Sequence, residues 1–146
     1  MSSVKTIYFV SGLPRSGATL FSAIINQNPK VYSSPQTDLV DQMTMLINST
    51  NNSTTFISGQ LKDGYLNAIN KFPQNFYESL DAEIIFDKNF KWGLPEYFET
   101  AKTINPIVKI LCFYRPVLEV LSSFIIQCGP EIGNNFIDNG VKKEGY

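Results

Sequence analysis

Apolar residues gather in three short runs along the chain, and each run predicts a strand in the core of a protein. The first, Lys5–Ser11 (KTIYFVS), is β-branched and aromatic with almost no polar interruption, a pattern typical of a strand covered on both faces. Glu83–Phe86 (EIIF) and Ile107–Tyr114 (IVKILCFY) are the second and third runs. A shorter extended piece is predicted at Val31–Ser33.

Between these runs, apolar residues recur at the spacing of a helix. Leu20, Ile24 and Ile25 predict a helix in LFSAIINQ. It ends at Asn28-Pro29, because proline disfavours helical geometry in the residue before it. A polar loop over residues 49–55 (STNNSTT) is expected to break the next helix. The further predicted helices are Asp38–Ile47, residues 57–80 with an interruption at Pro73, Leu94–Ile104, and VLEVLSSFII after Pro116.

The order of these elements predicts the fold class. Strands that alternate with helices form a parallel sheet with helices on its faces, so we expect a three-layer α/β domain. The chain has 146 residues, about the length of one domain, and we take residues 1–146 as a single domain. Periodicity fades near the end, so residues 128–146 are expected to form an irregular tail.

The balance of charge argues against some classes of partner. Lysine and arginine number 12 against 13 acidic residues, whereas proteins that coat nucleic acid or anionic membranes are usually basic. No window approaches the roughly 18 apolar residues of a membrane span, and the first residues lack a signal-peptide pattern. We therefore expect a cytoplasmic protein without a nucleic-acid or membrane partner, in which Cys112 and Cys128 are reduced.

Two features of composition direct attention to anions. Histidine is absent, which removes histidine-based catalysis and histidine-ligated metals, and two cysteines cannot form a metal cluster. Arginine occurs only at Arg15 and Arg115, against ten lysines. Because a planar guanidinium suits phosphate and carboxylate, the surroundings of these two arginines are candidate anion sites.

Arg15 lies in a glycine-rich turn, Gly12–Thr19 (GLPRSGAT), between the first strand and the first helix. Such a turn aims backbone N–H groups and a helix dipole at an anion. Gly12 and Gly17 have the spacing of the phosphate-binding loop G-x-x-x-x-G-K-[ST], and Thr19 occupies its hydroxyl position. Ala18 stands at the lysine position of that motif, so the cation of this loop is Arg15. The alternative is a tight turn that binds no ligand.

The stretch FVSGLPRSGATLFSAIINQNP closely resembles the 5'-phosphosulfate loop of the P-loop sulfotransferases. It is most similar to the subgroup with arginine in this loop, which includes protein-tyrosine sulfotransferases and sulfotransferase-like proteins of bacteria and phages. The resemblance implies a P-loop NTPase-like fold that binds 3'-phosphoadenosine 5'-phosphosulfate (PAPS) as sulfonyl donor and releases 3',5'-ADP. The implied binding residues of the loop are Gly12, Pro14, Arg15, Ser16, Gly17, Ala18 and Thr19. Ala18 replaces the usual threonine.

Two segments further along the chain extend the resemblance. The family's 3'-phosphate motif is a strand that ends in arginine, followed by a helix with a serine eight residues on; Arg115 and Ser123 match it in FYRPVLEVLSSF. Ser123 could otherwise be an ordinary exposed helix residue. Lys88, in IIFDKNFKW, falls where the family often has a lysine that reaches the sulfonyl group. A solvated turn lysine is the alternative reading of Lys88.

The resemblance implies sulfonyl transfer to a hydroxyl or amine on a small molecule, carbohydrate or peptide. In-line transfer needs charge stabilisation, which Arg15 and Lys88 could supply without a metal. The acceptor also needs a base, and family members use His or Glu, whereas Gln36 stands at that position here. Asp38 and Asp87 could substitute; we predict Asp38, whose alternative role is to cap the following helix.

Two other functions remain open from the sequence. A P-loop kinase of a nucleotide or small metabolite is opposed by Ala18 and by the lack of a strand that ends in consecutive acids. A truncated, non-catalytic nucleotide-binding relative is favoured by Gln36 and by the short chain, since members of the sulfotransferase family are usually considerably longer.

Overall fold

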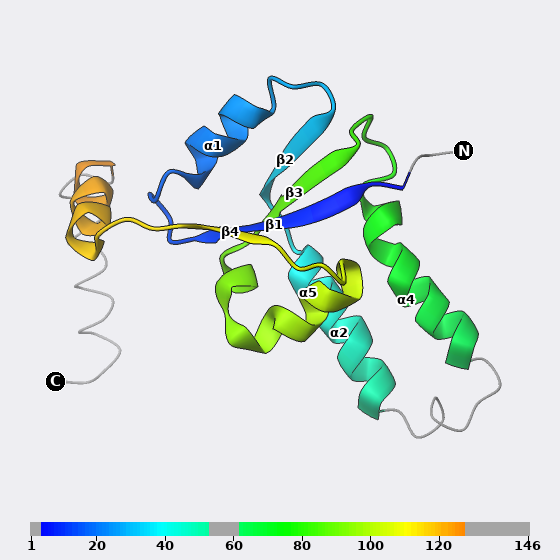
Figure 1. Cartoon of the computed structure of the whole chain (residues 1–146). Helices are drawn as coiled ribbons and strands as arrows, with labels where there is room; N and C mark the ends of the chain where they lie inside the picture. The colour runs from blue at the N-terminus through cyan, green and yellow to red at the C-terminus, as the bar shows by residue number, and fades with distance from the viewer. Residues whose placement is uncertain (1–3, 53–61, 128–146) are drawn as a thin grey trace, which may run out of the picture.

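The computed structural model of the protein describes residues 4–52 and 62–127. Its centre is a sheet of four parallel strands in the order β2-β3-β1-β4 (Figure 1). The strands are β1 (Thr6–Gly12), β2 (Val31–Gln36), β3 (Ile84–Lys88) and β4 (Ile110–Phe113). Each apolar run of the sequence supplies one of them, and the extended piece after Pro29 supplies β2.

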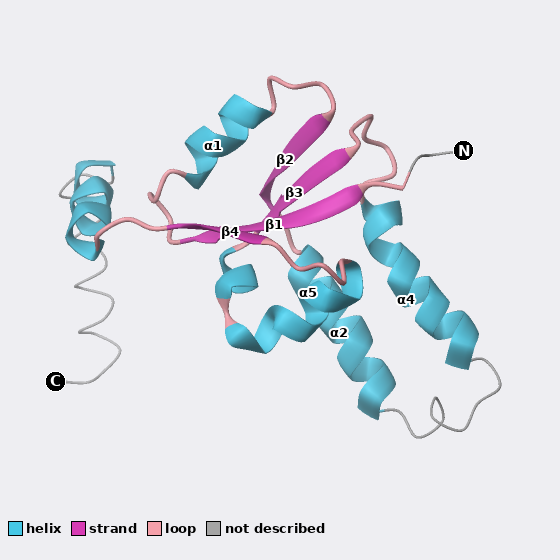
Figure 2. Cartoon of the chain, viewed as in Figure 1, coloured by secondary structure: helices cyan, strands magenta, loops and turns pink. Residues whose placement is uncertain are grey.

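Helices cover both faces of this sheet (Figure 2). One face carries α1 (Ala18–Ile25), and the other carries α2 (Leu39–Asn52), α4 (Lys62–Phe76) and α5 (Phe98–Ile104). Two short 3-10 turns, η1 (Phe90–Gly93) and η2 (Pro95–Tyr97), lead from β3 into α5. The predicted three-layer α/β fold with a parallel sheet is therefore confirmed.

Alternation along the strands decides what each face of the sheet contacts. Phe9 of β1 is fully buried and packs on Trp92, with ring centroids 4.5 Å apart. This face joins the main apolar core, which also contains Ile7, Ile85, Leu39, Val40, Met43 and Ala101. The next residues along the strands face the other way, where Phe86 meets Phe21 of α1 edge-on at 5.7 Å. Successive residues of a strand therefore pack against different helical layers.

A further helix follows β4 and occupies residues 117–127 (Figure 1). It lies at the carboxyl end of the sheet, beside the end of β1 and apart from the two helical layers. The predicted irregular tail, residues 128–146, lies outside the described residues. No helix in the described ranges is long and apolar enough to cross a membrane.

Several predicted boundaries are wrong in the described residues: β2 runs to Gln36 instead of Ser33, β4 begins at Ile110 instead of Ile107, and three helices differ as well. The loop expected from residue 49 does not break α2, which continues to Asn52. The hydroxyls of Ser49 and Thr50 donate to the carbonyls of Leu46 and Ile47, and so bond within the helix instead of competing with it.

Pro73 does not interrupt α4, because it is buried inside that helix and tertiary packing outweighs the lost backbone hydrogen bond. The helix predicted at Leu94–Ile104 begins instead as η2 and becomes α-helical only at Phe98. The rest of the predicted polar loop, together with residues 57–61 of the predicted helical stretch, lies outside the described residues.

Candidate functional site

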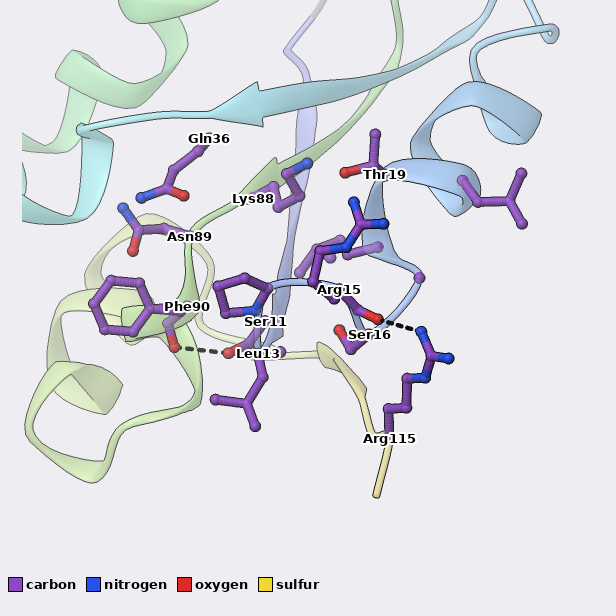
Figure 3. A pocket seen from close by; sticks show the side chains of 16 residues that line it. Ser11, Leu13, Arg15, Ser16, Thr19, Gln36, Lys88, Asn89, Phe90 and Arg115 are labelled. Carbon is purple, nitrogen blue, oxygen red and sulfur yellow. Dashed lines mark hydrogen bonds between the residues drawn. The ribbon is translucent and has the colours of Figure 1, made fainter. Parts of the chain in front are cut away.

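The carboxyl ends of the parallel strands meet at one edge of the sheet, and a cavity of about 600 Å³ opens there (Figure 3). Each strand contributes to its lining at or just beyond its last residue: the glycine-rich loop after β1, Gln36 of β2, Lys88 of β3 and Arg115 beyond β4. This edge is the usual ligand site of open α/β sheets. The predicted site residues that line the cavity are Gly12, Pro14, Arg15, Ser16, Gly17, Ala18, Thr19, Lys88 and Arg115.

Backbone conformation shapes the loop. Gly12 has φ 146°, and a Cβ placed there would lie 2.7 Å from the Phe113 carbonyl oxygen, so only glycine allows this approach of β1 to β4. Arg15 has φ 66°, in the left-handed region that residues other than glycine seldom adopt. The Ser16 N–H donates to the Leu13 carbonyl at 3.2 Å and closes the turn around Arg15.

The start of α1 is left open toward this cavity. Gly17 precedes the helix with φ 104°, no side chain caps the helix, and its first turn holds no acidic residue. The first N–H groups of a helix lack intrahelical acceptors and carry the positive end of its dipole. Ala18 and Thr19, which line the cavity, belong to this first turn. The loop therefore presents hydrogen-bond donors and partial positive charge.

The side chains strengthen that positive potential. Among the described residues that line the cavity, Arg15, Lys88 and Arg115 are cationic and none is acidic, although the whole chain has a net charge of -1. Figure 3 shows the side chains of Arg15, Lys88 and Thr19 turned toward the same part of the cavity. Lys88 is the last residue of β3 and is half-buried, so it is not a solvated turn lysine.

Hydrogen bonds join the two predicted phosphate positions. Arg15 Nε donates to Ser123 Oγ at 2.9 Å, and Arg115 Nη1 donates to the Arg15 carbonyl oxygen at 2.9 Å (Figure 3 draws the second bond). Arg115 Nε also pairs with Glu119 Oε2 at 3.1 Å. Ser123 lines an adjoining cavity of about 340 Å³ together with both arginines. Residues 100 or more positions apart thus meet in one network.

Ser16 contributes a buried hydroxyl with an unused bonding capacity. Its Oγ is a buried side-chain atom for which no hydrogen-bond partner exists among the described residues. Burying a hydroxyl without a partner is costly, and nearly all such groups in proteins are satisfied by protein, water or ligand. This oxygen lies beside Gly12, and the open helix start and the cations next to it form a site suited to an anion rich in oxygen atoms.

The two aspartates considered as bases lie outside the cavity lining. Asp87 is fully buried on the face of β3 opposite Lys88, where Thr37, Tyr77 and Trp92 donate hydrogen bonds to it. Burial raises the pKa of the Asp87 carboxyl group, and these hydrogen bonds oppose the shift only in part. It therefore does not face a ligand in this cavity.

Asp38 is exposed just before α2 and lines neither the large cavity nor the adjoining one. It lies near Lys91, whose pKa is raised first by a hydrogen bond to Asp41 and least by the charge of Asp38. Gln36 is the residue of this segment that lines the cavity.

Part of the cavity lining, at the end away from Arg115, consists of residues that the sequence did not predict. Leu13, Asn89 and Phe90 lie there (Figure 3). Phe90 is about half exposed, and Asn89 is buried, with its amide donating to the Thr37 carbonyl at 2.6 Å. The signal that could have found Asn89 and Phe90 is their position directly after Lys88, since residues just past a parallel strand reach the same edge.

No protein-family model matches this chain, and no curated protein matches its sequence.

Proposed function

We propose that the protein is a PAPS-dependent sulfotransferase with a P-loop NTPase-like fold, which transfers a sulfonyl group to a hydroxyl or amine acceptor. One observation carries the proposal: the loop GLPRSGAT and an uncapped helix start open into the same cavity as Lys88 and Arg115, with Ser123 hydrogen-bonded to Arg15. A donor with phosphate groups at both ends of a ribose needs two separate anion sites, and this network supplies candidates for both.

The residues present fit such a donor. The unpartnered Ser16 hydroxyl, the first N–H groups of α1 and the Arg15 guanidinium are the proposed ligands of the 5'-phosphosulfate. Arg115 and Ser123 are the proposed ligands of the 3'-phosphate, because both line the adjoining cavity. When bound, PAPS supplies the sulfonyl group and 3',5'-ADP is the leaving product. No metal enters this proposal.

In this proposal, charge stabilisation falls to Arg15 and Lys88. Each holds a positive charge at the cavity, and removing one such hydrogen-bond donor from a preorganised site costs about 3–4 kcal/mol of transition-state stabilisation. Gln36, Leu13 and Phe90 border the end away from Arg115, which we assign to a small-molecule, carbohydrate or peptide acceptor. Asp38, which is exposed outside the cavity lining and two residues from Gln36, is the proposed base.

A non-catalytic protein that binds the same nucleotide is the second candidate. The observation that favours it is the lack of a carboxylate or histidine among the described residues that line the cavity. A P-loop kinase is disfavoured because Ala18 occupies the lysine position of the kinase loop. We also propose a cytoplasmic location, with which the free, exposed thiol of Cys112 agrees.

Calorimetric titration with 3',5'-ADP, 5'-AMP and ATP with Mg²⁺ tests the proposal. We expect 3',5'-ADP to bind more tightly than 5'-AMP, and Arg115→Ala to remove most of that preference, since a charge-assisted hydrogen bond contributes about 1.5–3 kcal/mol. Lys102→Ala, which removes a surface charge paired with Glu99, is the matched control and should change neither affinity. Equal affinity for the two adenylates, or binding of ATP only with Mg²⁺, would overturn the proposal.

A transfer assay with PAPS then separates the enzyme from the binding protein. Turnover with a hydroxyl or amine acceptor supports the enzyme. Tight 3',5'-ADP binding without transfer to any acceptor of a broad panel supports the non-catalytic candidate.

A further inference from the structure

Asp87 is an ionisable group at the middle of the fold that the proposed mechanism does not use. It is fully buried, and its three hydrogen-bond donors come from separate parts of the chain. Thr37 follows β2, Tyr77 follows α4, and Trp92 belongs to η1. Thr37 Oγ1 donates to Asp87 Oδ2 at 2.6 Å, Tyr77 OH donates to the same oxygen, and Trp92 Nε1 donates to Oδ1 at 2.5 Å.

Thr37 is tied to three consecutive residues at the end of β3. Besides the bond to Asp87, its N–H donates to the Lys88 carbonyl at 3.1 Å, and its own carbonyl accepts from Asn89 Nδ2 at 2.6 Å. These bonds follow directly after the point where β2 and β3 shift register, between Ser33 and Gln36. Within the shift itself, Ser34 Oγ accepts from the Lys88 N–H at 2.9 Å. Of the three bonds of Thr37, the one donated by its hydroxyl ends on the buried face of the sheet, at Asp87.

These bonds between Thr37 and residues 87–89 adjoin two residues of the cavity lining. Gln36 precedes Thr37, Lys88 follows Asp87, and Gln36 and Lys88 are paired in the sheet while both line the cavity. Because successive residues of a strand face opposite sides, anchoring Asp87 below the sheet fixes the backbone from which Lys88 projects above it. The side chain of Lys88 itself has no hydrogen-bond or ion-pair partner in the described part of the chain, so its position depends on that backbone.

We infer that Asp87, acting through Thr37, is a positioning residue that sets the spacing between Gln36 and Lys88 across the acceptor half of the cavity. The kinetic test of this role rests on the proposed function. The contacts that place Asp87, Thr37, Gln36 and Lys88 together do not depend on it. Asp87 does not touch a ligand in this arrangement. Its role is to hold Lys88 where the transferring group must pass.

The test compares two variants, each of which lacks one of the two hydroxyls that donate to Asp87 Oδ2. Thr37→Val removes the bond next to the cavity, and Tyr77→Phe removes the bond on the far side of the core. A purely structural role of Asp87 predicts that kcat follows the thermal midpoint in both variants alike. The positioning role predicts that Thr37→Val lowers kcat at least tenfold, while its affinity for 3',5'-ADP stays within twofold of the wild-type value. Tyr77→Phe should lower kcat less than threefold. Thr37→Ser, which keeps the hydroxyl, should have the kcat of the wild type.

A second measurement decides the inference without any turnover. Reductive methylation with ¹³C labels the lysines, and the Lys88 resonance, assigned with Lys88→Arg, reports the surroundings of its ammonium group in the unliganded protein. We expect this resonance to move in Thr37→Val, and to keep its wild-type position in Tyr77→Phe and Thr37→Ser. Trp92 is the only tryptophan, so its emission verifies in each variant that the Asp87 cluster remains assembled.

The outcomes separate the two proposals. Absence of 3',5'-ADP binding in the wild type overturns the proposed function, whereas the Lys88 resonance still decides the role of Asp87. An unmoved Lys88 resonance in Thr37→Val, or equal changes in Thr37→Val and Tyr77→Phe, overturns the positioning role even if the protein transfers sulfonyl groups.

Discussion

At the scale of single residues, Arg15 combines a strained backbone with a charge that faces the cavity. Its φ of 66° suits glycine, and Nε is the guanidinium nitrogen that donates a hydrogen bond, to Ser123. The two terminal nitrogens of its guanidinium have no partner in the part of the chain that the structure describes. A strained residue that retains its charge at a cavity is a common sign of a functional site.

Arg15→Gly is therefore expected to separate stability from binding. Glycine relieves left-handed strain of about 1 kcal/mol, which offsets the exposed hydrogen bond to Ser123, worth about 0.5–1.5 kcal/mol. The thermal midpoint of the unliganded protein should stay nearly unchanged, while 3',5'-ADP affinity falls at least tenfold. Lys30→Ala, which removes a charge from an exposed ion pair with Glu83, should leave that affinity unchanged. A large loss of thermal stability in Arg15→Gly would make Arg15 a structural residue.

Asp38→Asn tests the proposed base. A general base contributes about 10²–10⁴-fold to a rate, so transfer to a hydroxyl acceptor should slow by that factor while 3',5'-ADP binding is kept. Asp41→Asn is the matched control, because Asp41 pairs with Lys91 nearby and lines neither cavity. Wild-type rates in Asp38→Asn would exclude Asp38 as the base.

At the scale of elements, the site depends on how closely the glycine-rich loop approaches β4. Gly12 and Phe113 are paired in the parallel ladder, and the missing side chain of Gly12 leaves space for the Phe113 carbonyl and for Ser16 Oγ. Arg115 follows β4 by two residues, so the same approach brings it to the Arg15 carbonyl. The packing of two strands thus determines the position of Arg115, a proposed binding residue.

Gly12→Ala should destabilise the fold and displace Arg115. The added Cβ would lie 2.7 Å from the Phe113 carbonyl oxygen, and alanine would have to adopt the unfavourable φ of 146°. The free energy of unfolding should therefore fall by about 1–3 kcal/mol or more. Gly64→Ala is the control, because a Cβ there meets nothing within 4 Å and alanine favours a helix by about 0.5–1 kcal/mol. Urea denaturation measures both changes. Equal stability of Gly12→Ala and the wild type would contradict the close packing.

At the scale of the whole molecule, the buried Asp87 makes stability depend on pH. Burial raises the pKa of its carboxyl group above the ordinary value of 3.8, so the folded protein binds this proton more tightly than the unfolded chain does. The stabilisation from the bound proton is fully present below pH 3.8. It is lost as pH rises from there through the raised pKa of the folded state.

The comparison with Asp87→Asn isolates this effect, because the other carboxyl groups contribute equally to both proteins. The variant is less stable at low pH, since an amide cannot accept from all three hydrogen-bond donors. As pH rises above 3.8, the free energy of unfolding of the wild type should fall relative to that of the variant. The difference in stability between the two proteins should therefore narrow. Urea denaturation across this range measures it; a difference that widens with pH would contradict a raised pKa.

The sequence by itself determined the features that depend on neighbours along the chain. Apolar runs predicted the strands, and the spacing of Gly12 and Gly17 predicted a glycine-rich turn between the first strand and the first helix, which lines the cavity. The strand-ending position of Arg115 predicted its place at the same sheet edge, because parallel strands end together. Local preferences and strand direction are sufficient for these conclusions.

Only the tertiary structure decided the features that depend on distant contacts. Pro73 remains inside α4 because burial outweighs its local preference, which periodicity does not reveal. Asp87 and Lys88 adjoin in sequence, yet one enters the core and the other the cavity, because strand alternation assigns faces only once the layers are known. Asp38 lies outside the cavity for a similar reason: the bonds of Thr37 to β3 direct Gln36 inward, and those bonds join residues about 50 positions apart.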